Sequence, residues 1–136
     1  MKITLRHLPE TALTEEYCSI TRVVHDMKSC TVYLMTSPSH QQIEIEFGGV
    51  VGVKILDERD FGQFWRSNME TFEEIPHALV SQIVRGGWVQ SDEIQGSHVP
   101  SGFYGEVLEY FVSGDYECVN VLCAAPPILR LDGALT

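Results

Sequence analysis

Apolar and polar residues alternate along two segments near the end of the chain, residues 107–112 and 117–123. Alternation with a period of two is typical of strands that bury one face. Between the segments, Gly114-Asp115 has glycine at the position where a type II′ turn favours it. The pattern predicts an antiparallel hairpin with a two-residue loop, in which Tyr110 lies opposite Val119.

This register sorts the side chains of the hairpin onto two different faces. One face is almost wholly apolar, whereas the other places Glu109 opposite Asn120 and is expected to be partly exposed. Phe111, Cys118 and Leu122 are the apolar members of this mixed face, and no obvious element covers them. One hypothesis is therefore a homo-oligomer that buries the mixed face.

A second hairpin is expected around Gly48-Gly49. A three-residue loop pairs Ile45 with Val53 on an apolar face and Glu44 with Lys54 on the solvent side. Upstream of it, residues 2–8, 17–25 and 30–36 are rich in β-branched and aromatic residues and are expected to be strands.

The middle of the chain permits more than one interpretation. Pro76 and Gly86 frame a helix over residues 77–85, whereas the composition of residues 79–84 also fits a strand. A short helix is expected over residues 61–67. The fold class that follows is α+β: a single domain over residues 1–136, mainly antiparallel β-sheet built from hairpins, with one or two short helices.

Composition indicates an ordinary globular chain, because 136 residues with 44% hydrophobic and 21% charged side chains can bury a core of their own. The chain shows no secretion signal, so Cys18, Cys30, Cys118 and Cys123 are expected to be free thiols, mostly half-buried in strands. No window approaches the ~18 apolar residues that a membrane span needs, and a cytoplasmic location is expected.

The sequence has no motif for catalysis or metal binding. Cys-x-x-Cys, His-Glu-x-x-His and Gly-x-Ser-x-Gly do not occur, and the histidines have no ligand spacing. The glycine-rich residues 48–52 lack the helix and the Lys-Ser or Lys-Thr pair of a phosphate loop. We therefore expect no enzyme activity, no cofactor and no metal ion.

Nineteen acidic residues against nine basic ones give a formal net charge of −10. This charge disfavours nucleic acid and anionic membranes, and it attracts cationic partners. The acidic runs are either solvated surface or an anionic patch, and the tryptophans are either core residues or apolar anchors in that patch. The candidate partner-binding residues are Asp57, Glu58, Asp60, Trp65, Glu70, Glu73, Glu74, Trp88, Asp92 and Glu93.

Three stretches resemble a family of short, stand-alone bacterial proteins: residues 43–58, residues 83–89 around Trp88, and residues 109–127. Proteins of this kind look like immunity partners of secreted toxins. The resemblance implies a strand over residues 79–84 and a short helix near Trp88. Family members often have His before the tyrosine, where this chain has Glu109, so a role of that His does not transfer.

The leading hypothesis is a non-catalytic cytoplasmic binding protein that neutralises a basic toxin domain through carboxylates and aromatic anchors. The alternative is a small ligand-binding domain or enzyme with a pocket between the sheet and residues 61–100.

Overall fold

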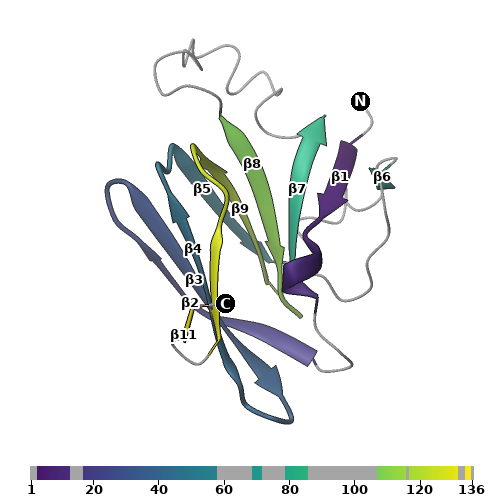
Figure 1. Ribbon diagram of the computed structural model, residues 1–136, viewed down its shortest axis with the longest axis vertical. Coiled ribbons are helices and arrows are strands. Elements are labelled where there is room, and N and C mark those ends of the chain that lie inside the picture. The colour runs from purple at the N-terminus through teal and green to yellow at the C-terminus, as the bar shows by residue number, and fades with distance from the viewer. Residues whose placement is uncertain are drawn as a thin grey trace.

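The computed structural model describes residues 3–12, 17–57, 69–71, 79–85, 107–115, 117–131 and 134–135. The strands are β1 (Ile3–His7), β2 (Tyr17–His25), β3 (Ser29–Ser37), β4 (Gln42–Gly48), β5 (Gly52–Asp57), β6 (Met69–Thr71), β7 (Val80–Arg85), β8 (Leu108–Ser113), β9 (Glu117–Cys123), β10 (Ile128–Leu131) and β11 (Ala134–Leu135). They form a six-stranded sheet in the order β5-β9-β8-β7-β1-β6 and a five-stranded sheet in the order β11-β10-β4-β3-β2 (Figure 1).

The prediction of mainly antiparallel sheet is confirmed. Nearly every neighbouring pair of strands is antiparallel, and the parallel pair is β1 with β6. Within the described residues, helical structure is limited to a 3₁₀ turn, Pro9–Thr11. The α+β class therefore overstates the helical content of this part of the chain. The helices expected over residues 61–67 and near Trp88 lie outside the described residues.

The strands expected over residues 2–8, 17–25 and 30–36 correspond to β1, β2 and β3. Of the two interpretations of the middle segment, the strand over residues 79–84 is confirmed as β7, and the helix over residues 77–85 is wrong. β7 pairs with β1 on one side and β8 on the other. This pairing satisfies its backbone groups within the sheet and outweighs the local helix signals.

The hairpin predicted around Gly48-Gly49 does not form. β4 pairs with β3 and β10, whereas β5 pairs with β9, so the chain passes from one sheet to the other between them. Gly49 has a φ of 61°, and Val51 N donates to Leu122 O at 2.8 Å. The alternating pattern determines which face of each strand is buried, but it does not determine which strand lies beside it in the sheet.

The hairpin of β8 and β9 forms, with the predicted faces but a register two residues away. Tyr110 lies opposite Val121 rather than Val119. Gly114 N donates to Glu117 O at 3.0 Å, so Gly114 flanks the turn instead of standing at its centre. A Cβ atom on Gly114 would lie 3.0 Å from Ile20 Cγ1. The glycine therefore permits close contact with β2.

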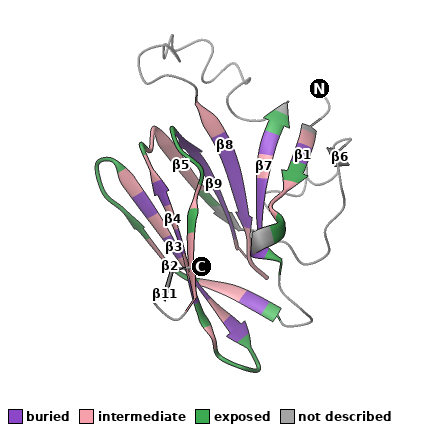
Figure 2. Cartoon of the chain, viewed as in Figure 1, coloured by how far each residue is buried: buried purple, intermediate pink, exposed green. Residues whose placement is uncertain are grey.

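The core lies between the two sheets. The rings of Phe47 on β4 and Tyr110 on β8 approach across the interface, with their centroids 5.8 Å apart. Figure 2 shows the buried residues along the central strands of both sheets. The buried cluster comprises Cys18, Cys30, Val32, Leu34, Ile43, Ile45, Phe47, Leu79, Val80, Tyr110, Val112, Val119, Val121 and Cys123.

The second face of the six-stranded sheet is also buried at β8 and β9, which corrects the expectation of partial exposure. Phe111, Cys118 and Leu122 are at most 2% exposed. Glu109 and Asn120 are buried with them. At these described positions the mixed face is buried in the folded chain.

Candidate functional site

Two of the predicted partner-binding residues fall in the described part of the chain. Asp57 is the last residue of β5, and Glu70 lies in β6. The remaining candidates lie outside the described residues: Glu58, Asp60, Trp65, Glu73, Glu74, Trp88, Asp92 and Glu93.

Asp57 and Glu70 are not brought together. Their strands, β5 and β6, are the two edges of the six-stranded sheet. With about 4.8 Å between neighbouring strands, these edges are roughly 24 Å apart. The acidic runs that begin near Asp57 and Glu70 therefore start from opposite edges.

Three acidic residues from two segments, the end of β5 and the β8–β9 hairpin, lie near one end of the sandwich. Asp57 occupies the register position opposite Glu117 on β9. Asp115 lies in the adjoining turn, and its backbone N donates to Cys18 O at 2.9 Å, which joins the turn to the start of β2. We call this group, together with Tyr17, the acidic end.

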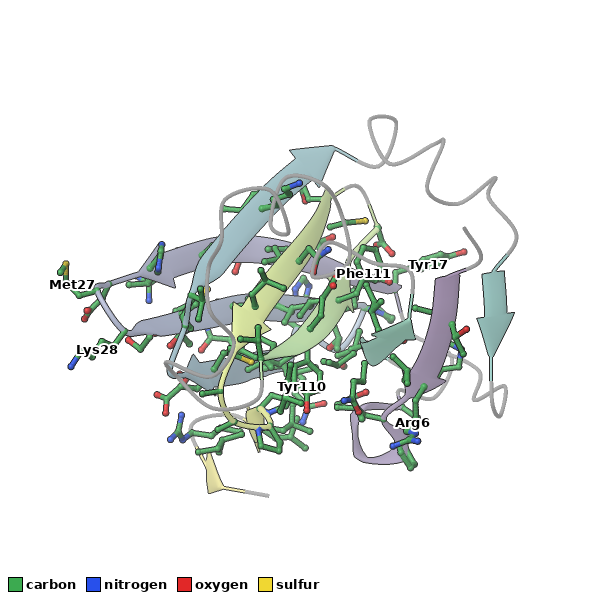
Figure 3. All side chains as sticks on the ribbon, turned by 90° about the horizontal axis from the view of Figure 1, so that it is seen from above. Arg6, Tyr17, Met27, Lys28, Tyr110 and Phe111 are labelled. Atoms are coloured by element: carbon green, nitrogen blue, oxygen red, sulfur yellow. The ribbon has the colours of Figure 1, made fainter. Side chains whose placement is uncertain are left out.

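Tyr17 gives the acidic end an exposed aromatic side chain. It begins β2, next to Cys18, and is 74% exposed. In Figure 3 it lies far from Met27 and Lys28, which occupy the opposite end of the β2–β3 hairpin. Sequence reasoning chose the tryptophans as aromatic anchors and missed Tyr17, Asp115 and Glu117, because nothing in the sequence indicates that the β8–β9 turn contacts β2.

The described side chains carry nearly balanced charge. The acidic ones are Asp26, Glu44, Glu46, Glu109, Asp115 and Glu117, and the basic ones are Arg6, Arg22, Lys28, Lys54 and Arg130. Most of the net charge of −10 therefore belongs to the other residues, which include the runs at 57–60, 70–74 and 92–93.

A buried polar pair lies on the second face of the six-stranded sheet. Asn120 Nδ2 donates to Glu109 Oε2 at 2.9 Å, and the two residues are 4% and 2% exposed. The two residues lie on one face, as predicted, but they are diagonal neighbours rather than direct partners, since Glu109 lies opposite Leu122, and they are buried rather than partly exposed. Lys54 on β5 occupies the register position opposite Asn120.

The amide oxygen of the same asparagine has no hydrogen-bond partner among the described residues. A buried acceptor without a donor costs free energy, about 1–3 kcal/mol in mutational data. An unpaired buried acceptor in a native protein needs an explanation. One explanation is that a ligand supplies the missing donor.

His7 and Ser81 form a second polar contact on this sheet. They are cross-strand partners on β1 and β7, and His7 Nδ1 lies 2.6 Å from Ser81 Oγ. Ser81 is buried. A hydrogen bond between opposite side chains stabilises the pairing of the two strands.

The four cysteines are free thiols, as expected, but they are buried rather than half-buried. Burial raises the pKa of Cys30 to about 11. Burial also raises the pKa of Cys123 to about 11, with a further increase from Cys30 and a lowering by the hydrogen bond to Ala125 O. Because the thiolate is the nucleophile, Cys30 and Cys123 are unreactive near neutral pH.

Within the described ranges, no three His, Cys, Asp or Glu side chains are grouped as a metal site would require. The same residues contain no helix that is both long and apolar enough to cross a membrane. Comparison with protein-family models, with curated proteins and with solved structures gives no significant match to this chain.

Proposed function

We propose that this protein is a non-catalytic binding protein that neutralises a basic partner, of the kind formed by immunity proteins and toxin domains. The observation that supports the proposal is the acidic end. There, Asp57 at the end of β5 meets Asp115 and Glu117 of the β8–β9 hairpin, which lies far from it in the sequence, and the exposed Tyr17 begins the strand beside them.

The sandwich provides a rigid support for this surface. Asp57 and Glu117 belong to paired strands, and the Asp115 turn is bonded to β2, so the backbone positions do not depend on a free loop. A preformed surface binds with a smaller entropy cost than one that orders on binding. Carboxylates accelerate encounter with a cationic surface, and an aromatic side chain supplies affinity where water is excluded.

Asp57 and the acidic residues that follow it in the sequence, Glu58 and Asp60, are changed together to test the proposal. The partner to use is the C-terminal domain of a secreted toxin encoded beside the gene for this chain, and calorimetry gives the affinity at several salt concentrations. In the variant Asp57→Lys, Glu58→Lys, Asp60→Lys we expect weaker binding and a smaller salt dependence, because fewer charge pairs are screened.

The second acidic run supplies a matched control. Glu70→Lys, Glu73→Lys, Glu74→Lys changes the net charge by the same amount but starts from the opposite edge strand, β6. This variant is expected to retain most of the affinity. Equal losses in both variants would indicate unspecific attraction, and unchanged binding in the first variant would remove the acidic end from the interface.

The unpartnered Asn120 Oδ1 favours a second function, a small ligand-binding site on the second face of the six-stranded sheet. The ligand would supply an N–H or O–H donor to this oxygen, beside the Glu109 carboxylate. Native mass spectrometry of the protein purified from its own cells tests this function. A bound small molecule that is lost in Asn120→Leu supports it, and the mass of the bare chain in the unaltered protein counts against it.

A further inference from the structure

Four residues form a transverse row across the outer face of the five-stranded sheet. Arg22 on β2 lies opposite Tyr33 on β3, Tyr33 lies opposite Glu44 on β4, and Glu44 lies opposite Arg130 on β10. Cross-strand partners point to the same face of a sheet. The inner face is taken by the buried residues that alternate with them, so this row faces away from the core.

The row is accessible and locally ordered. Arg22 is exposed, and Tyr33 and Glu44 are partly exposed. The Arg22 guanidinium lies over the Tyr33 ring, 4.2 Å from its centroid. Stacking restricts the long arginine side chain, so less conformational entropy remains to be lost when it pairs with a carboxylate.

The order of charges along the row makes it complementary to itself. A two-fold axis parallel to the strands and above β3 places Arg22 opposite Glu44 of a second copy, and Glu44 opposite Arg22 of that copy. On the same axis Tyr33 meets its own counterpart, as does Met35, the next outward residue of β3. The result is an aromatic and apolar centre between two ion pairs, the usual composition of a protein interface.

The described charged side chains of this face sum to zero in a strongly acidic protein. Arg22 and Arg130 balance Glu44 and Glu46, and Arg130 Nη1 contacts Glu46 Oε2 at 3.4 Å. Asp57 and Glu70 belong to the other sheet. Two copies can therefore approach through the five-stranded sheets while those acidic edges stay more than a Debye length away, about 8 Å at physiological ionic strength.

We propose that two copies of this chain form a symmetric dimer through the outer faces of their five-stranded sheets, with Arg22 of each copy paired to Glu44 of the other. In this dimer Asp57 and Glu117 of each copy belong to the six-stranded sheets and lie away from the contact, whereas Tyr17, opposite Ser37 on β3, lies on the same outer face as the row. This inference rests on the charge order of the row and is independent of the proposed partner.

The experiment uses two single variants whose charges are complementary. In Arg22→Glu each symmetric contact sets two carboxylates against each other, and in Glu44→Arg it sets two guanidinium groups against each other. Each pair occurs twice, so we expect the dimer dissociation constant to rise by roughly 100-fold in either variant, about tenfold per pair. A mixture of the two variants restores both ion pairs, and we expect a heterodimer.

Analytical ultracentrifugation and native mass spectrometry distinguish these species, and circular dichroism verifies that each variant is folded. Lys28→Glu is the control for Arg22→Glu, because it makes the same charge change at an exposed position in the β2–β3 turn, outside the row. It is expected to remain a dimer. A monomeric unaltered protein, a dimer that persists in Arg22→Glu, or variants that stay monomeric when mixed would overturn the proposal.

Discussion

Asn120 donates to Glu109 diagonally across β8 and β9. Asn120 lies opposite Phe111 in the register, and Glu109 lies opposite Leu122, yet Asn120 Nδ2 and Glu109 Oε2 are 2.9 Å apart. Diagonal neighbours on one face of a sheet are within reach of side chains of this length. The contact gives a buried carboxylate a hydrogen bond in an environment where an unpaired charge is costly.

The two residues are therefore expected to be strongly coupled. Glu109→Ala and Asn120→Ala each leave the other side chain without its partner, whereas the double variant removes both groups. We expect the double variant to be less destabilised than the sum of the single ones by about 1.5–3 kcal/mol, the range for hydrogen bonds to charged groups. Urea unfolding of the four proteins measures this coupling, and additive effects would show that the hydrogen bond contributes nothing.

Alternation correctly identified β4, β5, β8 and β9, because burial of one face imposes a period of two on a strand, and β-branched and aromatic composition identified β1, β2 and β3. It failed where the partner of a strand had to be chosen. The residue patterns of β4 and β5 would allow the two strands to pair with each other in a hairpin, but β5 pairs with β9 instead. Glycine explains part of the difference, since Gly49 redirects the chain between the sheets instead of closing a hairpin.

The adjacent glycines of this crossing are expected to respond differently to substitution. Gly49 has a φ of 61°, and a Cβ atom there would lie 2.7 Å from Ala124 Cβ, so Gly49→Ala meets both backbone strain and a clash. A Cβ atom on Gly48 meets nothing within 4 Å. We expect Gly49→Ala to lose about 1–3 kcal/mol of unfolding free energy and Gly48→Ala to change it by less than about 1 kcal/mol. Thermal and urea unfolding compare the two, and equal effects would contradict this role of Gly49.

Substitution of Gly114 tests the observed register of the β8–β9 hairpin. A Cβ atom there would lie 3.0 Å from Ile20 Cγ1 and 3.1 Å from Ile20 N. We expect Gly114→Ala to destabilise the protein by about 1–3 kcal/mol. In an Ile20→Ala background the cost should be smaller, because the clash with Cγ1 is gone, although the contact with the backbone remains. If glycine were required only at the centre of a type II′ turn, the cost would not depend on Ile20.

The acidic end could be predicted only in part. The acidic composition and the run at 57–60 are visible in the sequence, but the association of Asp57 with Glu117 and of Asp115 with Cys18 depends on the pairing of β5 with β9 and on the docking of a turn. Both are long-range contacts that local pattern does not specify. The same holds for the row from Arg22 to Arg130, which requires the register of four strands at once.

The raised pKa values of Cys30 and Cys123 predict a loss of stability in alkaline solution. An ordinary thiol has a pKa of 9.0, and burial raises both folded-state values to about 11. As the pH rises above about 9, the unfolded chain releases thiol protons that the folded chain retains, so the unfolding free energy decreases until the folded thiols also ionise near pH 11. Each thiol contributes a slope of up to about 1.4 kcal/mol per pH unit in this window.

Tyrosines and lysines titrate in the same range, so the informative quantity is the difference in unfolding free energy between the unaltered protein and the double variant Cys30→Ala, Cys123→Ala. The double variant is expected to be less stable at neutral pH because it leaves cavities, but its unfolding free energy should decrease less steeply between about pH 9 and pH 11. Parallel pH profiles for the two proteins would show that these thiols are not responsible for the alkaline loss.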